Sequence, residues 1–256
     1  MHDYTQQDIS NALKNIGISK GDILFSHSNV GFFGIPKGLR SHENIFNTLL
    51  DGVFDVIGAE GTLVVPTFTY SHSNGLPFDV DNTPSTCGFF TEMLRKHPGA
   101  CRSLDANISV AAIGQKAMEL TQNLPQNSYG EDSFFDRFYK ANGIICNFNF
   151  DAGSTFIHYV ERCLKVPYRY DKTFEGMVIQ QGKIFNKKSI IWVRDLELKN
   201  SEANFEKFNS LAVNTLKYKK CNVGRGMIGA ISAKDTFELI KQNIKSSPNL
   251  LLQKTT

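Results

Sequence analysis

Short apolar runs alternate with segments of helical period through the first half of the chain, and this alternation limits the possible folds more than any other feature. The runs at 22–25, 62–65 and 143–148 have the length and the aliphatic side chains of buried strands. Between the first two runs, apolar residues recur every three or four positions from Ser41 to Gly58, as on the buried face of a helix. Strands separated by helices predict an α/β fold.

The stretch 176–193 has a different pattern from the rest of the chain. Two short strand-like runs flank Gln181–Gly182, as the strands of a hairpin flank its turn, and Ser189–Val193 would add a third strand. We therefore expect a mainly parallel or mixed sheet with an antiparallel hairpin addition. No repeat or linker-like segment divides the 256 residues, which predicts a single domain over 1–256 with a frayed tail at 246–256.

Composition and charge exclude several classes of protein. Hydrophobic residues make up 41% of the chain, too many for wholesale disorder, and a net charge of +3 is too small to indicate a nucleic-acid or membrane-surface protein. The N-terminus has no apolar segment of the secretory type, and no CxxC, HxH or HExxH pattern is present. We expect a cytoplasmic location, five reduced cysteines, no metal, and a small-molecule partner. The hairpin also offers an edge for a homodimer.

Polar side chains follow three of the predicted strands, at Ser26–Asn29, at Thr67–Tyr70 and in the loop after Phe148. In open α/β sheets, ligands bind outside the carboxyl ends of the strands, so these segments are candidates for a binding site. The first segment matches neither the Walker A nor the GxGxxG pattern, so it does not indicate nucleotide hydrolysis or dinucleotide binding. Ligand binding and helix capping are equally compatible with it.

The densest group of reactive side chains lies between residues 149 and 161. His158 and Glu161 are spaced i and i+3, as neighbours on one helix face, and Thr155 lies one turn earlier. A carboxylate beside an imidazole fixes its tautomer and stabilises the imidazolium, and Asp151 is a second candidate for that role. The alternative is structural, with a capping hydroxyl, a core histidine and a solvated glutamate.

A second group spans residues 102–109. The guanidinium of Arg102, with Ser103 beside it, suits a phosphate or carboxylate, and Ser109 could present its hydroxyl at a strand edge. The structural alternative is an ion pair between Arg102 and Asp105. A different chemistry, with Cys101 or Cys146 as a nucleophile beside His158, remains open, although nothing in the sequence near either cysteine supports it.

Taken in order, these segments resemble the aminoglycoside 3-N-acetyltransferase family. The similarity covers roughly residues 5–240, and it is carried by Gly21–Ser28, Gly61–Phe68, His97–Gly99 with Arg102–Ser103, Ser109–Gly114, and Thr155–His158 with Glu161. Each piece alone is weak, but the ordered set is fairly specific.

The resemblance implies a three-layer α/β/α fold and an acetyl-CoA-dependent N-acetyltransferase. It also implies that His158 is the general base, supported by a carboxylate. Our hypothesis for the chemistry is direct transfer of the acetyl group to a sugar amine. For the transfer step, we expect a backbone N–H or the hydroxyl of Ser109 or Thr155 at the oxyanion. Carried over by position, the coenzyme A site is lined by Ser26, His27, Ser28, Asn29, Val30, Gly31, Ser109, Val110 and Ala111, and Arg102 and Ser103 are candidate phosphate ligands.

One position departs from the family pattern, because antibiotic-resistance members usually carry His-Pro where this chain has Asp105–Ala106. The pattern of Arg102–Asp105, together with Thr155–Glu161 and Val166–Tyr170, is more similar to the branch that acetylates nucleotide-linked amino sugars, of the perosamine type, for O-antigen or other surface polysaccharides. We therefore expect such a substrate, contacted by Thr67, Tyr70, Asp105 and Arg169, with its diphosphate near Arg102, Arg169, Lys172 and Arg225. The alternatives are an aminoglycoside 3-N-acetyltransferase, a cysteine-dependent amidase or acyltransferase, and a binding protein without catalysis.

Overall fold

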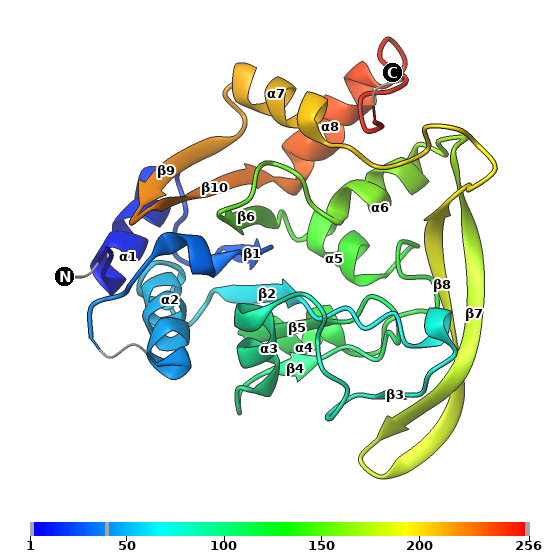
Figure 1. Cartoon of the computed structure of the whole chain (residues 1–256), viewed down its shortest axis with the longest axis horizontal. Coiled ribbons are helices and arrows are strands. Elements are labelled where there is room, and N and C mark those ends of the chain that lie inside the picture. The colour runs from blue at the N-terminus through cyan, green and yellow to red at the C-terminus, as the bar shows by residue number, and fades with distance from the viewer. Residues whose placement is uncertain (1–2, 39–40, 254–256) are drawn as a thin grey trace.

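The computed structural model describes residues 3–38 and 41–253, and its centre is a seven-stranded mixed sheet (Figure 1). The strands lie in the order β4-β5-β2-β1-β6-β10-β9. Their bounds are β1 Ile23–Phe25, β2 Thr62–Pro66, β4 Cys101–Arg102, β5 Val110–Gly114, β6 Ile144–Phe148, β9 Lys219–Val223 and β10 Gly226–Ser232. Strand β1 pairs in parallel with β2 and β6, and the other pairs of this sheet are antiparallel. The predicted mixed sheet is confirmed, and its parallel part is limited to the three central strands.

Side chains of the central strands alternate between two hydrophobic cores, one on each face of the sheet. In β1, Phe25 belongs to the core that contains α5, α6 and α8, whereas Leu24 belongs to the core that contains α1, α2 and α3. The predicted three-layer α/β/α arrangement is therefore confirmed. The helices are α1 Gln6–Asn15, α2 His42–Ile57, α3 Phe89–Lys96, α4 Ala117–Thr121, α5 Phe134–Lys140, α6 Phe156–Cys163, α7 Glu206–Asn214 and α8 Ala233–Asn243.

Local sequence signals explain where several helices begin and end. Thr5 and Asp8 form a capping box at the start of α1, in which each side chain accepts a hydrogen bond from the backbone N–H of the other residue. Ser41 accepts from the backbone of Asn44 at the start of α2. That helix ends at Gly58, whose φ of 66° lies in the left-handed region that favours glycine.

A second sheet lies along one side of the molecule, in the order β3-β7-β8 (Figure 1). Its strands are β3 Phe78–Asp79, β7 Arg169–Gln180 and β8 Lys183–Arg194, and β7 and β8 form a twelve-pair antiparallel hairpin. The turn is Gln181–Gly182, as predicted, and both residues have positive φ. The separate third strand expected at Ser189–Val193 is wrong, because those residues continue β8.

The end of the chain packs more tightly than the sequence indicated. Leu250 and Leu251 are buried, and Leu252 pairs with Ala203, so the expected fraying is wrong as far as Gln253. The rest of the predicted tail, Lys254–Thr256, lies outside the described residues. Over 3–38 and 41–253, no helix is both long enough and apolar enough to cross a bilayer.

Candidate active site

The candidate site lies where β1 and β6 end and α6 begins. The arrowheads of β1 and β2 point toward the side of the molecule that carries the β7–β8 hairpin (Figure 1). The segment that follows β1 stays beside the end of β6. Asn29 N–H donates to the carbonyl of Phe148 at 2.8 Å, and Phe148 N–H donates to the carbonyl of His27 at 2.9 Å. The predicted segments at 26–29 and after Phe148 therefore meet.

His158 and Glu161 form a hydrogen-bonded pair on α6. His158 Nδ1 and Glu161 Oε2 are 2.6 Å apart. The histidine side chain is 19% exposed, whereas the glutamate side chain is completely buried. The structural alternative of a solvated glutamate is wrong, and the imidazole is reachable from the surface while its carboxylate partner is shielded from water.

Two further groups contact the buried carboxylate of Glu161. The hydroxyl of Tyr168 donates to Oε1 at 3.0 Å, and Nε of Arg169 lies 2.9 Å from Oε2. Burial alone would raise the pKa of Glu161, but His158, Arg169 and Tyr168 together lower it below its usual value. Glu161 is therefore a carboxylate at neutral pH.

An ionised Glu161 fixes the tautomer of His158. A carboxylate only accepts hydrogen bonds, so we assign the imidazole proton to Nδ1 and the free lone pair to Nε2. Tyr129 and Phe205 lie against the ring, with centroids at 6.0 and 5.9 Å. A neutral imidazole held in this way has the form that a general base requires.

Thr155, the residue before the first turn of α6, contacts a second histidine. Its backbone N–H donates to Nε2 of His27 at 3.3 Å, and its hydroxyl lies 3.1 Å from the same nitrogen. Burial is the main cause that lowers the pKa of His27 to about 4, so this imidazole is neutral at pH 7. Thr155 is thus held one helical turn from His158.

Asn147 joins these pieces, although no motif in the sequence indicated a role for it. Its Oδ1 accepts from the backbone N–H of His27 at 3.1 Å, and its Nδ2 donates to the carbonyls of Asp151 and Gly153. The only signal was an amide inside the otherwise apolar run 143–148. Such a buried amide must be satisfied, and here it ties β1 to the loop before α6.

Asp151 closes a turn instead of contacting His158. Its Oδ1 accepts from the backbone N–H of Gly153 at 2.8 Å, and the carboxylate on the imidazole is that of Glu161. The prediction that left both residues open as the partner is corrected in favour of Glu161. Spacing on the helix was the better guide, because residues three apart share a face.

The segment 26–31 offers two unsatisfied polar atoms. Among the described residues, Nδ1 of His27 and Oγ of Ser28 are buried and have no hydrogen-bond partner. Asn29 and Gly31 are exposed, whereas Ser26 and Val30 are buried. Buried polar atoms without a partner are rare and call for an explanation such as a ligand. The coenzyme A contacts expected for this segment stay a prediction.

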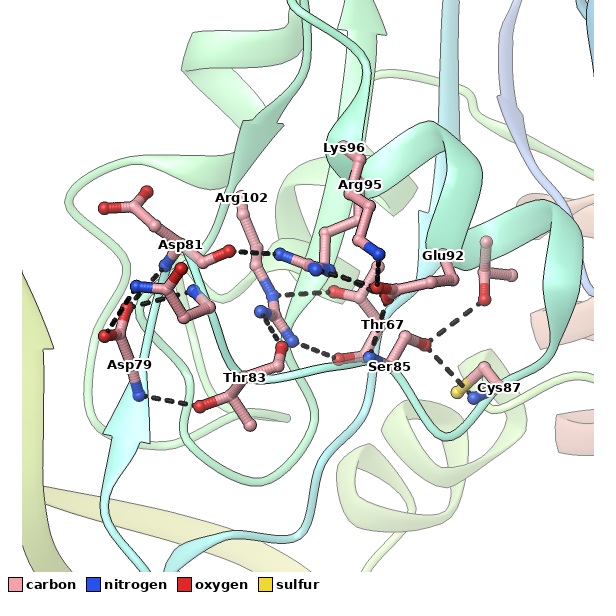
Figure 2. Close-up of polar contacts among 12 residues, drawn as sticks. Thr67, Asp79, Asp81, Thr83, Ser85, Cys87, Glu92, Arg95, Lys96 and Arg102 are labelled. Atoms are coloured by element: carbon pink, nitrogen blue, oxygen red, sulfur yellow. Dashed lines mark hydrogen bonds and ion pairs between the residues drawn. The ribbon is translucent and has the colours of Figure 1, made fainter. Parts of the chain in front are cut away.

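Arg102 is not available to a ligand (Figure 2). All three guanidinium nitrogens donate within the protein, to the carbonyls of Val80, Thr83 and Thr67 and to the hydroxyls of Thr67 and Ser109. Burial lowers its pKa to about 10, so it remains charged at pH 7. The predicted phosphate contact of Arg102 and the alternative ion pair with Asp105 are both wrong.

The neighbouring segment is interior as well. Ser103, Ser109, Val110 and Ala111 are all at most 1% exposed, because β5 pairs with β4 on one side and β2 on the other. The hydroxyl of Ser109 donates to the carbonyl of Thr67, which is itself buried. Their predicted contacts with coenzyme A, the oxyanion role of Ser109 and the substrate role of Thr67 are therefore wrong.

Of the other predicted substrate contacts, only Tyr70 remains free to make one. Asp105 uses its carboxylate to accept from the N–H groups of Asn107 and Ile108 and from the hydroxyls of Ser128 and Ser189. Arg169 is paired with Glu161, whereas Tyr70 is 42% exposed. Asp105 therefore holds a turn, which corrects its predicted role as a substrate ligand.

The cysteine alternative finds no support in the geometry. Cys146 lies in the core on the face of the sheet opposite to α6, and burial raises the pKa of its thiol. Cys101 belongs to β4, at the edge of the sheet beyond β5. In the described part of the chain, no group of three or more histidine, cysteine, aspartate or glutamate residues could hold a metal ion.

A family model and curated relatives of this chain are described as aminoglycoside 3-N-acetyltransferases. A family model described as aminoglycoside 3-N-acetyltransferase matches residues 35–245. Aminoglycoside N(3)-acetyltransferase IX of Micromonospora chalcea is 23% identical, over 91% of this chain and 88% of that protein. The corresponding enzyme VII of Streptomyces paromomycinus is 23% identical, over 79% and 73%.

Two solved structures of aminoglycoside acetyltransferases superimpose on this chain. Aminoglycoside acetyltransferase AAC(3)-Xa superimposes with a TM-score of 0.81 at 20% identity, over 94% of this chain and 93% of that one. AAC-IIIb in its binary complex with CoASH superimposes with a TM-score of 0.78 at 18% identity, over 98% and 99%. These likenesses establish the shared fold.

The expectation of a nucleotide-linked amino sugar for surface-polysaccharide synthesis is wrong. The matching family model and the relatives are named for aminoglycosides. In the structure, Asp105 holds a turn, and the cations that were assigned to a diphosphate contact other groups of the protein. Besides Arg102 and Arg169, Arg225 pairs with Asp3 and Lys172 lies over the ring of Phe174.

Proposed function

The chain belongs to the aminoglycoside 3-N-acetyltransferase family, and we propose that it transfers the acetyl group of acetyl-CoA to an amine of an aminoglycoside. It is an N-acetyltransferase with acetyl-CoA as co-substrate. The observation that supports the catalytic assignment is the partly exposed His158 on the buried carboxylate of Glu161. We also propose that residues 1–256 act as one catalytic domain, since the large sheet takes strands from both halves of the chain.

The first step is proton transfer to His158 as the substrate amine attacks the thioester carbonyl. A bond forms between the amine nitrogen and the carbonyl carbon, and Nε2 of His158 takes the proton that the nitrogen loses. The imidazolium that forms is stabilised by Glu161, which lies 2.6 Å from Nδ1. Positioned base catalysis of this kind contributes about 10²–10⁴-fold.

The second step is loss of the thiol from the tetrahedral intermediate. The carbon–sulfur bond breaks and the sulfur leaves with the bonding electron pair, which requires no strong acid because a thiol has a pKa of about 8.5. The proton on His158 passes to the departing sulfur or to solvent, which restores the neutral imidazole. The products are an acetamide and free coenzyme A.

We assign the thioester end of acetyl-CoA to the segment 26–31 and to Thr155. The buried, unpartnered Ser28 Oγ and His27 Nδ1 support this assignment, because bound coenzyme A would supply the partners they lack. Thr155 lies one turn from His158, and its hydroxyl is the candidate donor to the oxyanion that develops on the carbonyl. To donate there, the hydroxyl would turn its proton away from Nε2 of His27, which lies 3.1 Å away. Tyr70 remains a candidate contact for the aminoglycoside.

A thiol-release assay with acetyl-CoA tests the proposed substrate class. We expect release with kanamycin, sisomicin or gentamicin, and a product heavier by one acetyl group in mass spectrometry. The matched control is the same aminoglycoside already acetylated at its 3-amino group, which should not support release. Thiol release that no aminoglycoside stimulates would overturn the proposal.

The same assay separates direct transfer from an acyl-enzyme route. Direct transfer needs a ternary complex, so initial-rate plots at several acetyl-CoA concentrations should intersect. Parallel lines, or loss of activity in a Cys146→Ala or Cys101→Ala variant that still folds, would instead favour a covalent cysteine intermediate.

A further inference from the structure

Glu161 is shared between the base and a buried cation. We infer that Arg169 and Tyr168 are positioning residues, which set the charge and orientation of the Glu161 carboxylate against Nδ1 of His158. The inference rests on the proposed role of His158, but its test below does not depend on turnover.

The two oxygens of the Glu161 carboxylate contact different side chains. Oε2 meets both His158 Nδ1, at 2.6 Å, and Arg169 Nε, at 2.9 Å, whereas Oε1 accepts from Tyr168 at 3.0 Å. The N–H of Arg169 Nε makes no directed hydrogen bond, so its contact with Glu161 is an attraction between charges. Arg169 is anchored from the other side, where Nη1 donates to the carbonyl of Trp192 at 3.4 Å.

The charges around the pair add up to zero before the reaction. Glu161 contributes −1, Arg169 contributes +1, and His158 is neutral as a base. Two other titratable groups face the pair, Tyr129 from the loop before α5 and His27 from the loop after β1. Burial raises the pKa of Tyr129 and lowers the pKa of His27 to about 4. Both groups are therefore uncharged at pH 7. Tyr70 and Asp105 act on Tyr129 from beyond it, and Asp171 is paired with Arg162.

The consequence concerns how firmly the imidazole holds a proton. A carboxylate alone would strongly favour the imidazolium, because an opposite charge at this distance stabilises the charged form. Arg169 offsets that attraction while keeping Glu161 ionised and therefore able to orient Nδ1–H. Tyr168 acts in the same sense, since its hydroxyl draws charge on the carboxylate toward Oε1. Removing either residue should make the imidazole harder to deprotonate.

Nitrogen-15 NMR of the histidine rings in the free enzyme measures directly which ring nitrogen of His158 carries a proton and at what pH the ring gains a second one. The wild type should show His158 as the Nδ1–H tautomer, with its signals identified by their loss in His158→Asn. In Arg169→Met, the midpoint of the His158 titration should move to higher pH, on the order of one pH unit, because the offsetting charge is gone. Arg169→Lys, which keeps a cation, should restore most of that change.

Two further variants separate a positioning role of Arg169 and Tyr168 from a purely structural one. Arg162→Met removes a cation from α6 that contacts Asp171 and should leave the midpoint unchanged. Should Arg169→Met fail to fold, Tyr168→Phe removes one hydroxyl and should move the midpoint in the same direction by a smaller amount. If the folded variants lose thermal stability while the midpoint stays at the wild-type value, Arg169 and Tyr168 are structural only and the inference is overturned.

Activity gives a second readout once an aminoglycoside substrate is in hand. The acid limb of kcat/KM should move to higher pH in Arg169→Met, whereas KM for acetyl-CoA should stay within about threefold. An altered NMR titration without any acetyl transfer would leave the positioning role standing and reject the proposed function. Turnover with an unaltered titration would do the reverse.

Discussion

Replacing Glu161 by Gln is the perturbation whose consequences the structure defines best. Glutamine keeps the shape of the side chain but removes the negative charge that faces His158 Nδ1 at 2.6 Å. At about 4 Å between charge centres and an effective dielectric constant of about 20, the lost attraction to the imidazolium is about 4 kcal/mol. Because the imidazolium forms only as the amine attacks, kcat should fall by about 10³-fold.

The same substitution should also lower stability. Arg169, whose side chain is only 7% exposed, would lose its counter-ion. Removing one member of a buried pair typically costs about 3–5 kcal/mol, since the other charge stays buried and unpaired. Urea unfolding at pH 7.5 measures this loss separately from kcat.

Thiol release at saturating acetyl-CoA and aminoglycoside is the assay, and Asp151→Asn is the matched control. Asparagine retains an oxygen that can accept from Gly153 N–H, so this variant should keep kcat within about tenfold. The reasoning is refuted if folded Glu161→Gln retains more than about a tenth of wild-type kcat, or if Asp151→Asn is the more damaging change.

Two further predictions follow from buried groups. Arg102→Met should lower the free energy of unfolding in urea by about 3 kcal/mol, because the carbonyls of Val80, Thr83 and Thr67 lose their donor. The affinity for coenzyme A, measured by calorimetry, should stay unchanged. A weakened affinity at wild-type stability would contradict this prediction. His27 has its pKa lowered from 6.5 to about 4, so the unfolded chain takes up a proton below pH 6.5 that the folded one refuses. Wild-type stability should therefore fall by up to about 3 kcal/mol more than that of His27→Gln between pH 7.5 and pH 4, and equal losses in the two proteins would be the contrary result.

Much of the fold followed from local patterns in the sequence. The strands at 22–25, 62–65 and 143–148 were found because each is an apolar run, and in the structure each lies in the centre of the sheet. The length of the β7–β8 hairpin was underestimated, because charged and polar side chains fill much of 169–176 and 183–188 and hide the strand period. Pairing between the two strands, and not burial, defines that hairpin.

The site was predicted where it depends on short-range spacing and missed where it depends on the fold. His158 and Glu161 are three residues apart on one helix, so their contact was foreseeable. The contact of Arg169 with Glu161 requires the chain to leave α6 and turn back as β7, which no spacing rule encodes. Arg102 was predicted as an anion site because the sequence does not show that its guanidinium donates to the carbonyls of Thr67, Val80 and Thr83 (Figure 2).

The most direct test of the central claim is kcat of His158→Asn with coenzyme A affinity and folding measured on the same preparation. A base at this position predicts that kcat falls by about 10²–10⁴-fold while the affinity for coenzyme A stays within a few-fold of wild type. Near-normal turnover by a folded His158→Asn enzyme would show that His158 is not the general base.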